Sequence, residues 1–347
     1  MENIFVIKIF VITALSFLVA LFWMPFLLAT LKKYNIGKKI RDEKTTPIFS
    51  RLHQKKEGTP TMGGILIWGT VLFLSILFFY LQVIFDSELL KHFNFLTRKE
   101  TFLPLGALIA AAIVGLFDDL FNVKKIGPNG GGLRVRHRLL IYAFVAVVGA
   151  WWFYFKLEWS EIHVPFMGNF EIGWWYIPFF IFVIVATSHS VNLTDGLDGL
   201  AGGALLSSFA AYGAISFAQG RYDLAAFCGA IIGALLAFLW FNINPAKFFM
   251  GDTGAMSLGV TLGIVAMLSG YVLLLPIIGS VFVIETMSVL IQWTHRKVAG
   301  KKLFLSSPLH HHLEAKGWQE ATIVMRFWVI SGVSAVMGLI LFFWDKG

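Results

Sequence analysis

Long apolar segments constrain this chain more than any other feature of its sequence. Each is about as long as the roughly 20 residues that a helix needs to cross the hydrocarbon core of a bilayer. Because hydrocarbon offers no hydrogen-bonding partner, backbone that crosses it forms helices or a closed barrel. We therefore predict an all-α integral membrane protein with about ten transmembrane helices, over residues 3–30, 62–85, 102–120, 138–156, 174–192, 198–217, 223–243, 253–270, 271–293 and 323–344.

The composition agrees with this prediction. Hydrophobic residues make up 57% of the chain and charged residues 14%, whereas soluble domains average about 45–50% and about 25%. The first apolar segment exceeds the roughly 7–15-residue core of a signal peptide, and no small-residue cleavage site follows it, so we expect a retained anchor. Cys228 is the only cysteine, which excludes an intrachain disulfide. We expect one polytopic domain over 1–347, with larger cytoplasmic loops at 31–61, 119–137 and 294–322.

The distribution of positive charge predicts the orientation. Of the 28 Lys and Arg residues, twenty lie in the loops that follow odd-numbered helices and six lie on the opposite side. Positive charge collects in cytoplasmic loops, so we expect these loops in the cytoplasm and both termini in the periplasm. Orientation explains most of the net charge of +8, and attraction of anionic substrates or lipid headgroups is the other reading. Without a recognised nucleic-acid-binding module, we expect no nucleic-acid partner.

Five of the nine aspartates lie at the ends of apolar segments. An ionisable group at the membrane edge requires water, a cation or a partner, and is a candidate for function. All five belong to the predicted cytoplasmic loops or the adjoining helix ends. We therefore predict that they gather at one face and form a metal-dependent active site there: Asp118, Asp119, Asp195, Asp198 and Asp252.

Asp118 and Asp119 end the third predicted helix. A helix C-terminus carries partial negative charge, so two adjacent carboxylates are disfavoured there unless a cation compensates. Mg²⁺ or the basic residues of the following loop would serve. The alternative is a solvated helix end with ordinary salt bridges.

A short polar loop, Asn192-Leu-Thr-Asp195-Gly-Leu-Asp198-Gly, joins the fifth and sixth predicted helices. Asp198 could cap the sixth helix and Asp195 could form an Asx-turn. Capping accounts for one aspartate more easily than for two with an asparagine, so a functional site is the other interpretation.

The loop from Asn242 to Asp252 joins the seventh and eighth predicted helices. Asp252 could be an ordinary N-cap. However, Gly251 and Gly254 allow backbone to approach a ligand closely, and a helix N-terminus attracts phosphate. Phe249 either packs in the membrane interface or stacks on a flat ring.

Two further basic segments are candidates for anion binding. Lys56 and the backbone amides around Thr61 could hold an anion, or this Gly- and Pro-containing segment could only shape a turn. His310, His311 and His312 could hydrogen-bond phosphates or lie in a solvated loop. Adjacent side chains cannot all face one ion, so we expect no three-histidine zinc site.

Two residues in the ninth apolar segment are unusual for a spanning helix. We expect Glu285 to be buried and hydrogen-bonded to neighbouring helices. Pro276 predicts that this helix is kinked or broken.

Taken together and in this order, the motifs resemble the phospho-N-acetylmuramoyl-pentapeptide-transferase family, within the polyprenyl-phosphate N-acetylhexosamine-1-phosphate transferases. The resemblance covers nearly the whole chain. The histidine segment points to the muramoyl-pentapeptide branch. The motifs are Gly58-Thr-Pro-Thr-Met-Gly-Gly64, Asp118-Asp119, Asn192-Leu-Thr-Asp-Gly-Leu-Asp-Gly199, Phe249-Met-Gly-Asp252 and Pro308-Leu-His-His-His312.

This resemblance implies transfer of phospho-MurNAc-pentapeptide from UDP-MurNAc-pentapeptide to undecaprenyl phosphate, giving lipid I and UMP. It implies a homodimer in the bilayer of the bacterial inner membrane and Mg²⁺ bound by Asp252. It also implies catalytic roles for Lys56, Asp118, Asp119, Asp252, His310 and His311. The implied substrate-binding residues are Thr61, Arg138, Asn192, Asp195, Gly196, Leu197, Asp198, Asn242, Phe249 and His312.

Two positions depart from the family pattern. Asn122 stands where a lysine is usual, although Lys124 and Lys125 are near in sequence. Arg138 also replaces a usual lysine, and a planar guanidinium is not equivalent to an ammonium group.

The mechanism and the substrate each leave an alternative open. A phosphomonoester has a second pKa of about 6, so we expect the acceptor to attack phosphorus directly, with Asp118 orienting it. A covalent intermediate on Asp118 is the alternative. A related transferase using UDP-GlcNAc is the rival function, and a secondary transporter is a more distant one, because transporter sites lie near the bilayer midplane.

Overall fold

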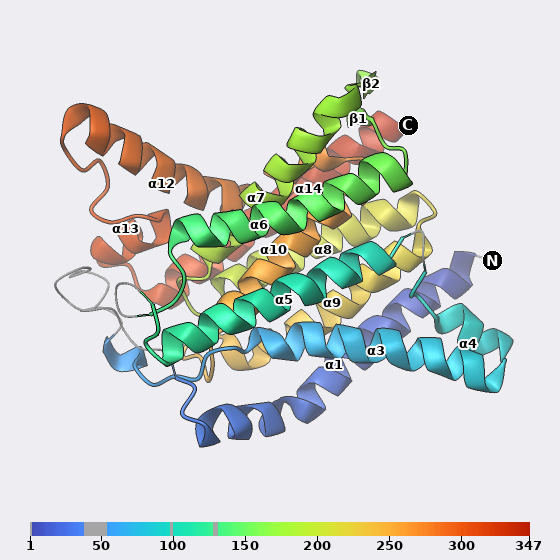
Figure 1. The fold of residues 1–347 in the computed structure, drawn as a ribbon, viewed down its shortest axis with the longest axis horizontal. Coiled ribbons are helices and arrows are strands. Elements are labelled where there is room, and N and C mark those ends of the chain that lie inside the picture. Colours follow the sequence, from blue (N-terminus) through green and yellow to red (C-terminus); the bar gives the residue numbers. More distant parts are fainter. Residues whose placement is uncertain (1, 38–53, 98–99, 128–130) are drawn as a thin grey trace.

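The computed structural model describes residues 2–37, 54–97, 100–127 and 131–347, and these are mostly helical (Figure 1). Seven basic residues that entered the charge count lie outside the described residues. They are Lys38, Lys39, Arg41, Lys44, Arg51, Arg98 and Lys99.

Nine helices in the described part of the chain are long and apolar enough to cross a membrane, and a bent pair brings the number to ten. This confirms the predicted membrane fold. The nine are α1 (Glu2–Lys33), α3 (Gly64–Phe85), α5 (Phe102–Val123), α6 (Val135–Trp151), α7 (Tyr176–Thr194), α8 (Leu200–Ala218), α9 (Tyr222–Asn242), α10 (Gly251–Leu268) and α14 (Glu320–Lys346).

The ninth predicted span is broken, as Pro276 indicated. The short helices η5 (Val272–Leu274) and α11 (Leu275–Ile278) precede α12 (Ser280–Ala299), and the two parts meet at 79°. The break itself falls at Gly279, which ends α11 and precedes α12.

The remaining elements are short, and two of them form a small hairpin in the loop between α6 and α7, in an otherwise helical fold. Strands β1 and β2 pair antiparallel, with Glu161 opposite Glu171. The β1 segment, Glu-Ile-His-Val, alternates polar and apolar residues as a half-buried strand does. The short elements are η1 (Gln54–Lys56), α4 (Glu88–Phe93), η3 (Trp152–Lys156), β1 (Glu161–Val164), β2 (Gly168–Glu171), η4 (Gly173–Trp175) and α13 (Leu309–Ala315).

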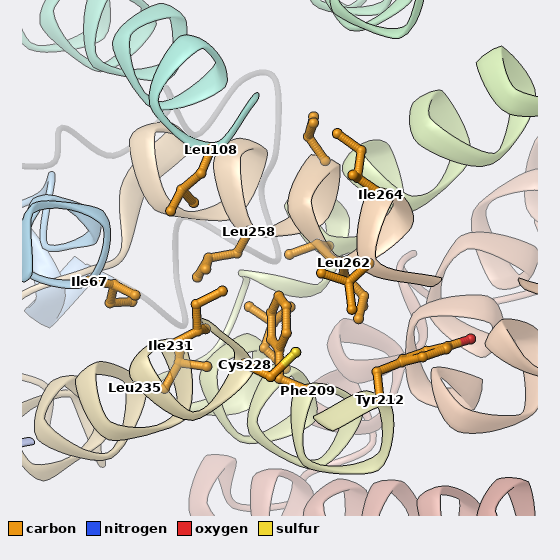
Figure 2. Packing of buried hydrophobic residues seen from close by; sticks show 14 of the residues in the cluster. Ile67, Leu108, Phe209, Tyr212, Cys228, Ile231, Leu235, Leu258, Leu262 and Ile264 are labelled. Atoms are coloured by element: carbon orange, nitrogen blue, oxygen red, sulfur yellow. The ribbon is translucent and has the colours of Figure 1, made fainter. Parts of the chain in front are cut away.

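Helix α10 forms the centre of the bundle, and every residue from Thr253 to Leu268 is buried. Leu258 and Leu262 of α10 pack between residues of α3 and α5 on one side and of α8 and α9 on the other (Figure 2). Small residues let its neighbours approach closely. A Cβ on Gly64 of α3 would lie 2.2 Å from the Cα of Gly254.

The two ends of the bundle differ in what they carry. Both chain termini lie at one end, together with β1, β2 and α4 (Figure 1). Helix α13 and the free end of α12 lie at the other end, where α5 ends and α6 begins. The predicted site residues therefore converge at the end of the bundle opposite the termini.

Candidate active site

A close contact between α5 and α10 positions the paired aspartates. A Cβ on Gly115 would lie 2.4 Å from the carbonyl oxygen of Asp252, so only glycine permits this approach. Residues three and four positions further along a helix lie on the same face. Asp118 and Asp119 therefore face the first turn of α10, where Asp252 lies.

Five side chains form what we call the carboxylate centre: Asp118, Asp119, Arg138, Asn192 and Asp252. Arg138 bridges two of its carboxylates, with Nε 2.6 Å from Oδ2 of Asp118 and Nη2 2.9 Å from Oδ2 of Asp252. The first contact is an ion pair rather than an aligned hydrogen bond. Asn192 donates from Nδ2 to Oδ1 of Asp252 at 2.5 Å. Arg138 is thus the cation that compensates the end of α5.

Asp118 is enclosed on both sides. Its side chain is fully buried, and Oδ1 accepts the backbone N–H of Leu133 at 2.6 Å while Oδ2 faces Arg138. Both carboxylate oxygens therefore already have a protein partner.

Asp119 has a different environment from its neighbour. Its two oxygens accept the backbone N–H groups of Asp252 and Thr253, each at 3.0 Å. The first N–H groups of a helix have no acceptor within the helix and carry partial positive charge. Asp119 thus caps α10, a role that the sequence suggested for Asp252, whose own side chain faces the carboxylate centre instead. Asp119 thereby holds the backbone from which the Asp252 carboxylate projects.

The donor atoms of the carboxylate centre suit a hard cation that phosphate helps to bind. Within the described residues, no group of three or more His, Cys, Asp or Glu could hold a metal by itself. Mg²⁺ typically takes only one or two carboxylates and completes its shell with substrate phosphates and water. Asp252, whose side chain faces this centre and is partly exposed, offers one such carboxylate.

A second cluster lies around Lys56, and we call it the lysine network: Lys56, Asp198, Asn244, Phe249 and Glu320. The ammonium group of Lys56 lies 2.6 Å from Oδ1 of Asp198 and 2.5 Å from Oε1 of Glu320. Asn244 donates to both carboxylates at 3.1 Å. The Nζ atom of Lys56 lies 5.9 Å from the centroid of the Phe249 ring. A cation and an aromatic face are therefore adjacent.

The sequence did not indicate Glu320 or Asn244 as site residues. Glu320 begins α14, and acidic residues are common in the first turn of any helix. It nevertheless also accepts the backbone N–H of Asp198 at 2.8 Å. No signal in the sequence separated this role from ordinary helix capping.

Several predicted substrate residues shape the loops. Asn242 accepts the N–H of Gly199 at 2.9 Å and donates to the carbonyl of Phe248 at 2.7 Å, so both ends of its amide are used. Leu197 and Thr61 are buried. Asp195 ends α7 as its C-cap residue.

The three histidines have three different partners. The Nδ1 atom of His310 lies 2.9 Å from Glu285, and that of His311 lies 2.7 Å from Glu314. His312 accepts the backbone N–H of Leu305 at 3.1 Å. Burial and the charge of Lys316 lower the pKa of His312.

The segment 192–199 connects these groups. Asn192 belongs to the carboxylate centre, Asp198 belongs to the lysine network, and Gly196 lies against the His310 ring.

Lys124 and Lys125 are exposed at the end of α5, whereas the side chain of Asn122 packs on the turn at Gly132.

Comparison with known proteins gives the same family as the motifs. A family model described as glycosyl transferase family 4 matches residues 101–270, and a phospho-N-acetylmuramoyl-pentapeptide-transferase signature matches residues 56–67.

Similar proteins bear one name, phospho-N-acetylmuramoyl-pentapeptide-transferase. The protein of Chloroflexus aggregans is 40% identical over 340 residues, covering 94% of this chain and 86% of the relative. That of Geobacillus thermodenitrificans is 39% identical over 336 residues, covering 95% and 97%. That of Bacillus anthracis is 38% identical over 337 residues, covering 96% and 98%. With its spanning helices, the chain is a multi-pass protein of the bacterial inner membrane, and it belongs to the phospho-N-acetylmuramoyl-pentapeptide-transferase family.

Proposed function

We propose that this protein transfers phospho-MurNAc-pentapeptide from UDP-MurNAc-pentapeptide to undecaprenyl phosphate, releasing UMP and forming lipid I. One observation carries the proposal beyond the name of its relatives. The Arg138 bridge between Asp118 and Asp252 and the lysine network around Phe249 are joined by one short segment, 192–199. The carboxylate centre, which suits phosphate chemistry, thus adjoins the lysine network, which suits recognition of a flat base.

We also propose that this end of the bundle faces the cytoplasm and that both termini lie in the periplasm. The termini lie at the opposite end from the site (Figure 1). The excess of Lys and Arg in the loops of the site end supports a cytoplasmic location for it.

The lysine network is suited to the nucleotide half of the donor. The Phe249 ring would stack on uracil, with Lys56 beside it as a cation for the diphosphate. Asp195, Gly196, Leu197 and Asp198 form the turn that would line this subsite. Because Asp198 and Glu320 already hold Lys56, the ammonium group is in place before substrate arrives.

Asp252 would hold Mg²⁺, with the donor diphosphate and water completing the shell. When bound there, the metal supplies positive charge that offsets the charge developing on the departing UMP. Arg138 contributes a fixed positive charge at the same place. Chelation by EDTA is expected to abolish UMP release, and added Mg²⁺ is expected to restore it.

The environment of Asp118 supports direct transfer over a covalent aspartyl intermediate. An attacking carboxylate needs a free oxygen, whereas both oxygens of Asp118 have protein partners and the side chain is fully buried. In the direct reaction an oxygen of undecaprenyl phosphate bonds to the β-phosphorus, and the bond from that phosphorus to the bridging oxygen breaks. UMP leaves with that oxygen. Asp118 and Arg138 orient the reactants, and positioning with charge stabilisation carries most of such a transfer.

A panel of donors tests the proposal. Purified protein in lipid nanodiscs, with Mg²⁺ and undecaprenyl phosphate, is mixed separately with UDP-MurNAc-pentapeptide and UDP-GlcNAc, and UMP is measured. We expect release only with the muramoyl donor. Release only with UDP-GlcNAc would assign the rival transferase reaction. Native mass spectrometry of the same samples tests the homodimer that we also propose.

A further inference from the structure

Glu285 is a buried ionisable group that the proposed transfer does not yet use. It lies in α12, and neither it nor His310 of α13 has exposed surface. The two are joined by a 2.9 Å contact between Oε2 and Nδ1. Burial of a charged or polar group is costly unless it is paired. The predicted hydrogen bond of buried Glu285 to a neighbouring helix is thus confirmed, and its partner is His310 of α13.

This contact determines which ring nitrogen of His310 is available to another hydrogen-bonding partner. An ionised carboxylate only accepts hydrogen bonds, so Nδ1 must carry the proton. The opposite nitrogen, Nε2, has no hydrogen-bonding partner within the described residues. In histidines of this kind the partner of one nitrogen sets the state of the other.

The free nitrogen faces the segment that joins the two clusters of the site. A Cβ on Gly196 would lie 2.2 Å from Nε2, so the ring edge lies directly against this turn. Gly196 adjoins Asp195 and is two residues from Asp198, which binds Lys56. Nε2 is buried beneath this turn and unpaired, so a phosphate-bearing substrate reaches it by displacing the turn.

We propose that Glu285 is a positioning residue for the transfer reaction. It holds His310 with Nδ1 protonated and aims Nε2 at the substrate bound over the Gly196 turn, where the imidazolium donates from Nε2 to a phosphate oxygen. The negative charge of Glu285 stabilises that imidazolium. This inference rests on the proposed function, because the ligand at Nε2 is the phosphate of its substrate.

Kinetics of three variants test the role of Glu285. Glu285→Gln keeps the shape and removes the charge, whereas Glu285→Asp keeps the charge on a shorter arm. Ser280→Ala is the matched control, since it removes a different interhelical hydrogen bond of α12, the 2.7 Å bond to Ser334. UMP release is measured against the concentration of UDP-MurNAc-pentapeptide, with the unfolding temperature of each variant.

We expect Glu285→Gln to lower kcat about 10- to 100-fold, as loss of a residue that orients an active group does, with little change in KM. Glu285→Asp should retain more activity than Glu285→Gln, and Ser280→Ala should match the unaltered protein. Full activity of Glu285→Gln would overturn the proposal. So would equal losses in Glu285→Gln and Glu285→Asp that follow equal losses of unfolding temperature.

A spectroscopic measurement on the unaltered protein keeps the test independent of variant folding. Nitrogen-15 resonances of labelled histidine report which ring nitrogen is protonated, and the His310 signals are those missing from His310→Gln. We expect Nδ1 protonated, and an unprotonated Nδ1 would overturn the inference. If the unaltered protein releases no UMP, the proposed function fails, whereas the nitrogen-15 measurement still tests whether Glu285 holds His310 with Nδ1 protonated.

Discussion

The Nε atom of Arg138 lies 2.6 Å from Oδ2 of Asp118. The same guanidinium reaches Asp252 at 2.9 Å, so one cation serves two carboxylates that come from different helices. A lysine ammonium is a compact charge, whereas the planar guanidinium spreads its charge over three nitrogens and can pair with two carboxylates at once. We therefore expect a lysine at this position not to reproduce the bridge between Asp118 and Asp252.

Arg138→Met should leave Asp118 and Asp252 close together without their shared cation. Removing one partner of a largely buried ion pair typically costs about 3–5 kcal/mol. We expect a lower free energy of unfolding in EDTA and loss of UMP release, with Arg138→Lys intermediate. Added Mg²⁺ should raise the unfolding temperature of Arg138→Met more than that of the unaltered protein. An equal rise in both proteins would show that Mg²⁺ does not bind where the Arg138 guanidinium lies.

Asp118→Asn and Asp119→Asn should both lose activity but should differ in stability. Asparagine at 119 offers one oxygen to two backbone donors, and its own amide N–H₂ group faces the other donor. Such an unsatisfied group costs about 1–3 kcal/mol. Asparagine at 118 can still accept the N–H of Leu133, and Arg138 keeps Asp252 as its partner, so the cost should be smaller.

Chemical unfolding of the two variants in the same detergent measures this difference. A greater loss of stability in Asp118→Asn than in Asp119→Asn would contradict the capping role of Asp119.

Gly196→Ala should displace His310. The added Cβ would lie 2.2 Å from Nε2, and Glu285 holds the opposite side of the ring. Overpacking of this kind typically costs about 1–3 kcal/mol, and we expect at least a tenfold loss of UMP release. Gly332→Ala in α14 is the control, because a Cβ there meets nothing within 4 Å. Full activity of Gly196→Ala would show that the observed position of the His310 ring is not required for UMP release.

The fold was largely predictable because apolar length alone defines a spanning helix. The predicted segment 223–243 and the observed α9 (Tyr222–Asn242) differ by one residue at each end. Helix α12 continues to Ala299, beyond the predicted 293. The prediction stopped early because Arg296 and Lys297, in the last turn of the helix, end the apolar run. Hydropathy therefore does not predict where a helix ends when its last turns are polar.

The sequence predicted that the aspartates gather, but not which contacts each of them makes. Charge counting placed the aspartates at one face, and the structure brings Asp118, Asp119 and Asp252 together. However, adjacent aspartates look alike in a sequence, and only tertiary contacts distinguish the buried ion pair of Asp118 from the cap formed by Asp119. Glu320 was missed for the same reason, since its partner Lys56 is distant along the chain.

Glu100 should make stability depend on pH in a specific direction. Burial is the main reason that the pKa of its carboxyl group is raised above the ordinary 4.5. The folded protein thus favours the protonated form, and this contribution to stability is lost as the pH rises through the raised pKa. Glu100→Gln, which can still accept the N–H of Leu224, should be more stable than the unaltered protein at neutral pH.

Unfolding temperatures measured from acid to neutral pH test this prediction. The difference between Glu100→Gln and the unaltered protein should be small below pH 4.5 and should grow as the pH rises. A difference that does not change with pH would contradict the assignment.

Transfer of the phosphorus atom is the most direct test of the central claim, which is that this site moves a phospho-sugar rather than a sugar alone. The donor is UDP-MurNAc-pentapeptide labelled with phosphorus-32 in the phosphate attached to the sugar, and the acceptor is undecaprenyl phosphate. The account predicts label in the lipid extract and unlabelled UMP in water. Labelled UDP in the aqueous phase, with an unlabelled lipid product, would contradict it.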